Sequence, residues 1–249
     1  MINIRGEDEI ELIRESSRIV AASLDLAGNM VGPGVTTGEI DREVENFIRS
    51  HGATPEFKGF HGYPAAICAS VNEQVVHGIP GERELRDGDI VGIDVGVRRN
   101  GYVGDGARTF AVGSVSEEAR RIMRVTRESL EAGLEVVRDG VHLSDVSHAV
   151  QTVAESAGFS VVRELAGHGV GTQLHEAPEI PNYGDPGYGP VLRTGMVLAI
   201  EPMINAAGPE VRTLGDGWTV VTADGGLSAH YEHTVAVAGD GVDILTVVT

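Results

Sequence analysis

The hydrophobic positions of the chain form two matching sets of helical stripes. Apolar residues at 40, 44, 47 and 48 follow Gly34-Val35, and apolar residues at 146, 150, 153 and 154 follow Gly140-Val141, at a constant offset of 106. Both sets have the i, i+4, i+7, i+8 spacing of an amphipathic helix that buries one face. Small and apolar residues in 13–27 and in 119–133 also share a helical face. Each half of the chain is therefore predicted to open with two helices.

Short apolar runs further along the chain predict strands that repeat in the same way. Segment 85–94 (LRDGDIVGID) matches segment 192–201 (LRTGMVLAIE) at an offset of 107. Apolar runs of this length beside glycine are typical of buried strands. Chance agreement between common patterns is the alternative, but four elements share the offset. We therefore predict an α+β protein with one domain, 1–249, whose halves, about 1–113 and 114–249, are related by a pseudo-twofold axis.

Acidic residues stand at equivalent positions of this repeat. Asp94 and Glu201 each end an apolar strand, and Asp105 and Glu232 each precede a strand with alternating polarity. An ionised carboxylate in a poorly hydrated interior is costly unless it is paired or bound to a metal. With His168, which lies between glycines, the set has four carboxylates and one imidazole. Such donors suit two divalent ions of Mn, Fe, Co or Zn, which activate water for attack on a carbonyl.

Each of these residues also has an ordinary structural explanation when it is considered alone. An Asp near a strand end commonly caps a turn, a Glu in a strand usually faces solvent, and a His between glycines commonly lies in a loop. It is their joint occurrence at repeat-related strand ends that favours a metal site.

The composition narrows the function further. A formal charge of -18 argues against a protein that reads nucleic acid, because phosphate contacts need clustered Lys and Arg. Cys68 is the one cysteine, so neither a disulfide framework nor a multi-cysteine zinc module is expected. No apolar run is long enough to cross a membrane, and the first residues lack the apolar core of a secretory signal. We therefore expect a cytoplasmic protein without a membrane partner.

Short motifs along almost the whole chain resemble those of one enzyme family. They are FHGYP at 60–64, SVNE at 70–73 with HGIP at 77–80, IDV at 93–95, GD at 104–105, GHGVG at 167–171, LHEAP at 174–178, IEPM at 200–203, and DGWT at 216–219 with YEHT at 231–234. In combination they resemble the type I methionine aminopeptidases of peptidase family M24, in their short bacterial-like form. The resemblance implies the pita-bread fold, in which helices pack on a curved antiparallel sheet.

The resemblance also implies a role for each acid. Asp94 chelates one metal, Asp105 and Glu232 bridge both metals, and His168 with Glu201 completes the second coordination sphere. The metals are two divalent ions per chain, of Co, Mn, Fe, Zn or Ni. Because all five ligands are present, an enzyme is favoured over the relatives that keep the fold and only bind peptides.

The expected reaction is removal of the initiator methionine from nascent proteins when the next residue is small. By the resemblance, metal-hydroxide hydrolysis breaks the first peptide bond. Glu201 carries the proton to the leaving amine, His175 donates a hydrogen bond to the carbonyl oxygen, and His77 orients the amide nitrogen. A structural role for the two histidines is the alternative.

Two binding sites follow from the resemblance alone. The first is a methionine pocket lined by Phe57, Phe60, Tyr63, Cys68, Leu174 and Trp218, because aromatic walls favour a thioether. Leu174 stands where the family has an aromatic residue and Phe57 replaces a smaller one, and these side chains could equally belong to the core. The second is a site for one Na or K ion near Asn72 and Ser228.

Other proteins on this scaffold supply the competing interpretations. A prolidase or X-Pro aminopeptidase can use the same five ligands, although such enzymes usually carry an additional N-terminal domain. A non-catalytic peptide-binding relative is the alternative from another class. For the present chain we expect a monomer that associates transiently with the ribosome and takes the N-terminal Met of nascent polypeptides as its substrate.

Overall fold

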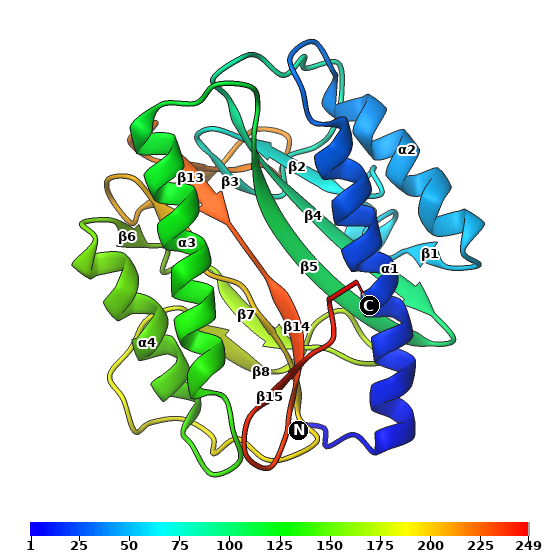
Figure 1. Cartoon of the computed structure of the whole chain (residues 1–249), viewed down its shortest axis with the longest axis vertical. Helices are drawn as coiled ribbons and strands as arrows, with labels where there is room; N and C mark the ends of the chain where they lie inside the picture. Colours follow the sequence, from blue (N-terminus) through cyan, green and yellow to red (C-terminus); the bar gives the residue numbers. More distant parts are fainter. Residues whose placement is uncertain (249) are drawn as a thin grey trace.

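The computed structural model describes residues 1–248, and in that range the helices form two pairs (Figure 1). They are α1 (Glu7–Met30), α2 (Thr37–Ser50), α3 (Glu117–Val136) and α4 (Leu143–Ser156). The predicted apolar stripes of α2 and α4 face the core, and their residues are buried except for Phe47 and Val153, which are partly buried. The prediction that each half opens with two helices is therefore confirmed. No helix among the described residues combines the length and hydropathy needed to span a membrane.

The two halves repeat their backbone contacts as well as their sequence pattern. The N–H of Gly34 donates to the Leu85 carbonyl oxygen over 2.8 Å, and the N–H of Gly140 donates to Leu192 over 3.0 Å. Both glycines have a left-handed backbone, with φ of 88° and 89°, which a side chain would disfavour. The matching glycines therefore mark the same turn before α2 and α4.

Apart from β4 and β5, with ten residues each, the strands are short, and the pairings between them are antiparallel. They are β1 (Thr54–Pro55), β2 (Cys68–Val71), β3 (Gln74–Val76), β4 (Ile90–Arg99), β5 (Tyr102–Ala111), β6 (Ser160–Val161), β7 (Ala166–Gly169), β8 (Glu176–Pro181), β9 (Val197–Ile200), β10 (Met203–Asn205), β11 (Val211–Thr213), β12 (Val220–Thr222), β13 (Ser228–His230), β14 (His233–Val237) and β15 (Val242–Ile244). A single 3-10 turn covers Phe60–Gly62. The prediction of an α+β protein is confirmed.

Two sheets, one from each half, position the residues of interest. The first has the order β1-β4-β2, with β5 paired to β4, and the second has the order β15-β14-β9-β7-β8. Helix α1 packs on β4 and β5, while α3 and α4 pack on each other beside the strands of the second half (Figure 1). Small three-stranded sheets, β13-β10-β6 and β11-β12-β3, complete the layer.

The prediction that Asp94 ends a strand and that Asp105 precedes one is wrong. Both lie inside the β4–β5 hairpin, whose strands each run for ten residues and turn at Asn100 and Gly101. The apolar pattern continues on either side, because Val95 and Val103 are fully buried. Polar residues interrupt the apolar run where the sheet faces a cavity, so the pattern resembles a strand end although the strand continues.

Two threonines join β5 to the strands of the second half. Thr234 Oγ donates to the Asp105 carbonyl oxygen over 2.7 Å and accepts from the Asp105 N–H over 3.0 Å. In the same way, Thr109 Oγ donates to the His230 carbonyl oxygen over 2.8 Å and accepts from the His230 N–H over 3.0 Å. Each half therefore uses one buried hydroxyl to replace a missing strand partner in the other.

Candidate active site

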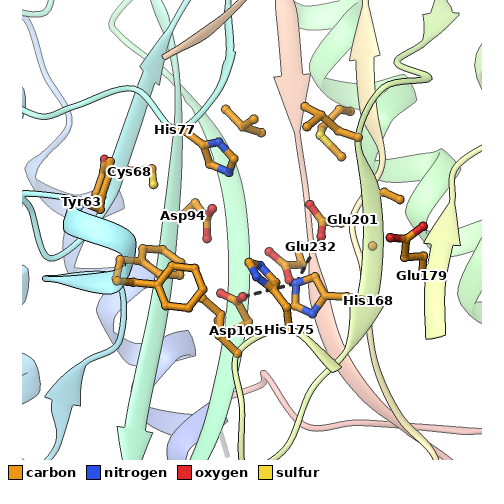
Figure 2. Close-up of a pocket in the computed structure, with 18 of the residues that line it drawn as sticks. Tyr63, Cys68, His77, Asp94, Asp105, His168, His175, Glu179, Glu201 and Glu232 are labelled. Carbon is orange, nitrogen blue, oxygen red and sulfur yellow. Dashed lines mark ion pairs between the residues drawn. The ribbon is translucent and has the colours of Figure 1, made fainter. Parts of the chain in front are cut away.

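A cavity of about 670 Å³ is lined by residues from both halves of the chain (Figure 2). All five predicted metal ligands, both predicted catalytic histidines and all six predicted methionine-pocket residues lie in its wall. The size is typical of a small-molecule or peptide-end site. Residues separated by up to 175 positions in sequence therefore meet at one place, where the two halves join.

The β4–β5 hairpin supplies the two aspartates. Asp94 pairs with Ala107 and Asp105 pairs with Gly96, so both side chains leave the same face of the hairpin. The glutamates come from the second half, where Glu201 follows β9 and Glu232 precedes β14. The Glu232 N–H donates to the Ala107 carbonyl oxygen over 2.9 Å, which fixes it against β5.

His168 on β7 presents one nitrogen to these acids. Its Nδ1 lies 2.9 Å from the Gly169 carbonyl oxygen, which can only accept, so Nδ1 carries the proton. The lone pair of Nε2 is then free, and it lies 3.5 Å from Glu201 Oε1 and 3.8 Å from Asp105 Oδ2. Ligand atoms of Asp105, His168 and Glu232 all lie within 4.8 Å of one another. This is the tautomer and the spacing that a metal ligand needs.

The protein supplies few positive charges or hydrogen-bond donors to offset the burial of these carboxylates. Burial raises the pKa of Asp94 to about 7 and that of Glu201 to about 8. Burial, followed by repulsion from neighbouring acids, raises the pKa of Asp105 and of Glu232 well above the usual range. Lysine and arginine are absent from the cavity wall, and Asp94 Oδ1 and Glu232 Oε1 have no hydrogen-bond partner among the described residues. The donor set therefore fits divalent cations.

The two predicted catalytic histidines lie on different sides of the acids, His77 above Asp94 and His175 below it in Figure 2. His77 follows β3 with a left-handed backbone, φ 58°. Burial and the nearby imidazoles His230 and His175 lower the pKa of His77 to about 4. Burial also lowers the pKa of His175, whose ring centroid lies 4.4 Å from that of His168. Both imidazoles are therefore neutral at pH 7 and can donate or accept a hydrogen bond.

The apolar wall of the cavity continues into the hydrophobic core. Tyr63 and Trp218 meet edge to face with ring centroids 5.1 Å apart, and the Tyr63 hydroxyl lies 3.0 Å from the Gly78 carbonyl oxygen. Phe57 packs against Gly96, where a Cβ would lie 2.5 Å from its ring. Burial raises the pKa of the Cys68 thiol, so this group stays protonated and apolar in character. These residues are thus both core and cavity wall.

The model for metallopeptidase family M24 matches residues 11–238. The chain belongs to metallopeptidase family M24. A relative from Clostridium perfringens, named methionine aminopeptidase, is 54% identical over 248 residues. The alignment covers 100% of the present chain and 100% of that relative. The crystal structure of methionine aminopeptidase from Rickettsia prowazekii superposes with a TM-score of 0.98 at 42% identity, over 99% of this chain and 100% of that one.

A more distant M24 similarity separates the two enzyme types that were considered. Prolidase from Pyrococcus furiosus has a TM-score of 0.79 at 25% identity, and the match covers 99% of this chain but 66% of that one. The pita-bread fold predicted from the motifs is therefore confirmed. The prolidase is related in fold, whereas the named methionine aminopeptidases match along their whole length.

Several residues in or beside the cavity were not predicted from sequence. His230 is 3% exposed, and its Nε2 lies 3.5 Å from Glu201 Oε2 without a hydrogen-bond partner among residues 1–248. It stands two positions before Glu232, so the alternation of a strand could have placed it on the same side. Of the residues that line the cavity, Glu164, Leu165 and Glu179 belong to none of the motifs, and Met203 ends the IEPM motif but was assigned no role.

The predicted cation-site residues lie outside the cavity wall. The Ser228 N–H donates to the Asn72 carbonyl oxygen over 2.9 Å, so the two residues are neighbours. The Asn72 side chain donates a hydrogen bond to Asp89 Oδ1 and accepts one from the Ile90 N–H. An Na or K ion beside these carbonyl oxygens stays a prediction.

Proposed function

We propose that the chain is a methionine aminopeptidase, which removes the initiator methionine of proteins whose second residue is small. The observation that carries this proposal is a single cavity in which a buried cluster of acids adjoins an aromatic wall. The full-length similarity to proteins of that name supports the same activity. An exopeptidase of this kind needs to hold a free amine, a thioether side chain and one peptide bond together.

We assign the metal ligands as the motifs imply. Asp94 would hold one divalent ion, His168 and Glu201 would hold the other, and Asp105 and Glu232 would contribute to both. Four carboxylates balance two divalent charges, and the unpartnered buried oxygens support this assignment. Bound here, the ions supply activation of water and polarisation of the scissile carbonyl. The oxygen-rich donor set with one imidazole suits Co, Mn, Fe, Zn or Ni.

The protein's own groups then handle protons and orientation. Glu201 lies between His168 and His230, so its carboxylate is placed to carry a proton to the departing amine. His175 donates to the carbonyl oxygen as it gains negative charge. His77 orients the amide nitrogen from the opposite side.

The substrate is held at its first residue. The methionine side chain lies among Phe57, Phe60, Tyr63, Cys68, Leu174 and Trp218, and its amine lies near Asp94. Since the amine must be free to approach that carboxylate, an internal peptide bond is excluded from the site. The expectation of a small second residue rests on the family resemblance.

Peptide cleavage tests the substrate assignment. We expect the metal-loaded enzyme to cleave Met-Ala-Ser, to leave Met-Leu-Ser almost intact and to leave Ala-Pro intact. Liberated amino acids are measured by chromatography. Preference for the X-Pro bond would instead support the prolidase alternative.

Three further features rest on the family resemblance. They are transient association with the ribosome, a monomeric state and an Na or K ion near Asn72 and Ser228. Sedimentation with and without purified ribosomes measures the first two.

A further inference from the structure

The loop between β7 and β8 carries His175 without regular secondary structure. Within residues 1–248 the His175 ring forms no hydrogen bond, and it packs against the rings of His168 and Phe60, at 4.4 and 5.4 Å between centroids. The ring therefore depends on the loop backbone for its position. Whatever fixes that backbone also fixes the hydrogen-bond donor that the proposed reaction requires.

Glu176, the next residue, ties the loop to itself. Its Oε1 accepts hydrogen bonds from the N–H groups of Thr172, over 2.8 Å, and of Gln173, over 3.1 Å. The Thr172 hydroxyl lies 3.2 Å from the same oxygen. Hydrogen bonds from backbone N–H groups to a carboxylate are stronger than those to a neutral acceptor, so these contacts stabilise the conformation of the loop.

Arg5 holds the Glu176 carboxylate from outside the loop. Arg5 Nη2 lies 2.8 Å from Oε1 and 2.7 Å from Oε2, and the two side chains are only 10% and 8% exposed. Asn3 Nδ2 donates to Oε2 over 2.6 Å. The Arg5 N–H donates to the Gly195 carbonyl oxygen over 2.8 Å, so the segment that carries this arginine is anchored to the second half.

The packing around Arg5 leaves it little freedom. A Cβ on Gly171 would lie 2.5 Å from Arg5 Nη2, so this glycine of the loop makes room for the guanidinium. On the other side of the loop, Arg98 Nη1 donates to the Thr172 carbonyl oxygen over 2.9 Å while its Nε donates to Glu56. The loop is thus held between two arginines, and both belong to the first half of the chain.

We propose that Arg5 is a positioning residue for His175, and that it acts through Glu176. The inference rests on the proposed function, in which His175 donates to the scissile carbonyl. Arg5 itself touches neither substrate nor metal ligands. A displacement of the donor by about 1 Å can reduce turnover up to about 100-fold without loss of substrate binding.

The kinetic test uses Arg5→Ala in the metal-loaded enzyme, with Met-Ala-Ser as the substrate. We expect kcat to fall roughly tenfold or more, with KM within about twofold. In a His175→Ala background the same change should have almost no further effect, because the group that it positions is gone. An equal loss in both backgrounds would contradict the inference.

Arg14→Ala is the matched control. Arg14 lies on α1 and pairs with Asp243, Nη2 to Oδ2 at 2.6 Å, away from the loop, in a pair that is more exposed than that of Arg5 and Glu176. We expect its kcat to stay within about twofold of the parent value. If Arg5→Ala is too unstable to assay, Arg5→Lys keeps the charge but loses the planar donor set, and a partial loss of kcat is expected.

A measurement that does not depend on turnover separates this inference from the proposed function. In the metal-free protein, the ring carbon–proton NMR signal of His175 should shift in Arg5→Ala, while that of His77 on the opposite wall should not. An unmoved His175 signal would overturn the positioning role. Full activity of His175→Ala would instead refute the proposed catalytic role of that histidine.

Discussion

Asp105 and Glu232 are two of the most completely buried charged side chains in the molecule, at 4% and 3% exposure. Buried carboxyls in the absence of a cation hold their protons, since burial and mutual repulsion both penalise the ionised form. Protons and metal ions therefore compete for the same oxygen atoms. Buried carboxylate oxygen atoms without a hydrogen-bond partner are thus the atoms at which a cation or a proton binds.

Asp105→Asn should abolish metal binding and turnover while leaving the fold intact. The amide keeps the shape but loses the charge that holds a cation, so we expect turnover to fall by at least about 100-fold. The metal-free variant should unfold at or above the temperature of the metal-free parent, because a buried acid is removed. Calorimetric titration and thermal unfolding measure both effects. Asp243→Asn, on β15 and paired with Arg14, is the control that should bind metal normally.

The raised pKa values also predict how pH changes stability. Asp94 and Glu201 keep their protons to a higher pH in the folded, metal-free protein than in the unfolded chain. Their contribution to the free energy of unfolding is therefore present at low pH and is lost as pH rises towards 8. His77 and His168, with pKa lowered to about 4, are neutral in both states above about pH 6.5. We expect the Tm of the metal-free protein to fall between pH 6.5 and 8. Addition of MnCl₂ should remove that slope, and a rising metal-free Tm would contradict the assignment.

At the scale of elements, periodicity predicted the helices and failed in the hairpin. The stripes of α2 and α4 recur over several turns, so their faces could be assigned from sequence. Strands of two or three residues, such as β6 and β11, are too short to show a period. The hairpin strands were cut short because Asp94 and Asp105 interrupt the apolar pattern at the cavity.

The sequence brought most of the predicted site residues to one cavity, whereas their roles stay predictions. Acids at repeated positions, and motifs shared with a family, pointed to the residues that line the cavity. His230 and Met203 were missed because a buried His or Met in a strand is usually core. Their role depends on β10 and β13 pairing beside the acids, which sequence alone does not show.

The two buried threonines between β5 and the second half should contribute measurably to stability. Thr234→Val keeps the shape but leaves the N–H and carbonyl groups of Asp105 unsatisfied, at a cost of roughly 1 to 3 kcal/mol for each group. Thr109→Val should cost a similar amount at His230. Urea unfolding gives both values. Thr152→Val, whose exposed hydroxyl bonds within α4, should change the free energy of unfolding by less than about 0.5 kcal/mol.

At the scale of the whole molecule, the acids form a site only where the halves meet. The first half contributes two aspartates, and the second contributes two glutamates and His168. Repeated backbone contacts such as those of Gly34 and Gly140 show that the scaffold is symmetric. The predicted ligand set is not symmetric, because His168 has no counterpart in the first half. The symmetry of the fold therefore does not extend to the predicted ligands.

Metal removal followed by re-addition is the most direct test of the proposed function. The protein is treated with a chelator and dialysed, and one divalent metal is then added back while bound ions and methionine released from Met-Ala-Ser are measured together. We predict no release from the metal-free protein and recovery as ions bind, with no recovery in Asp105→Asn. Release of methionine at the full rate by the metal-free protein would contradict the proposed mechanism.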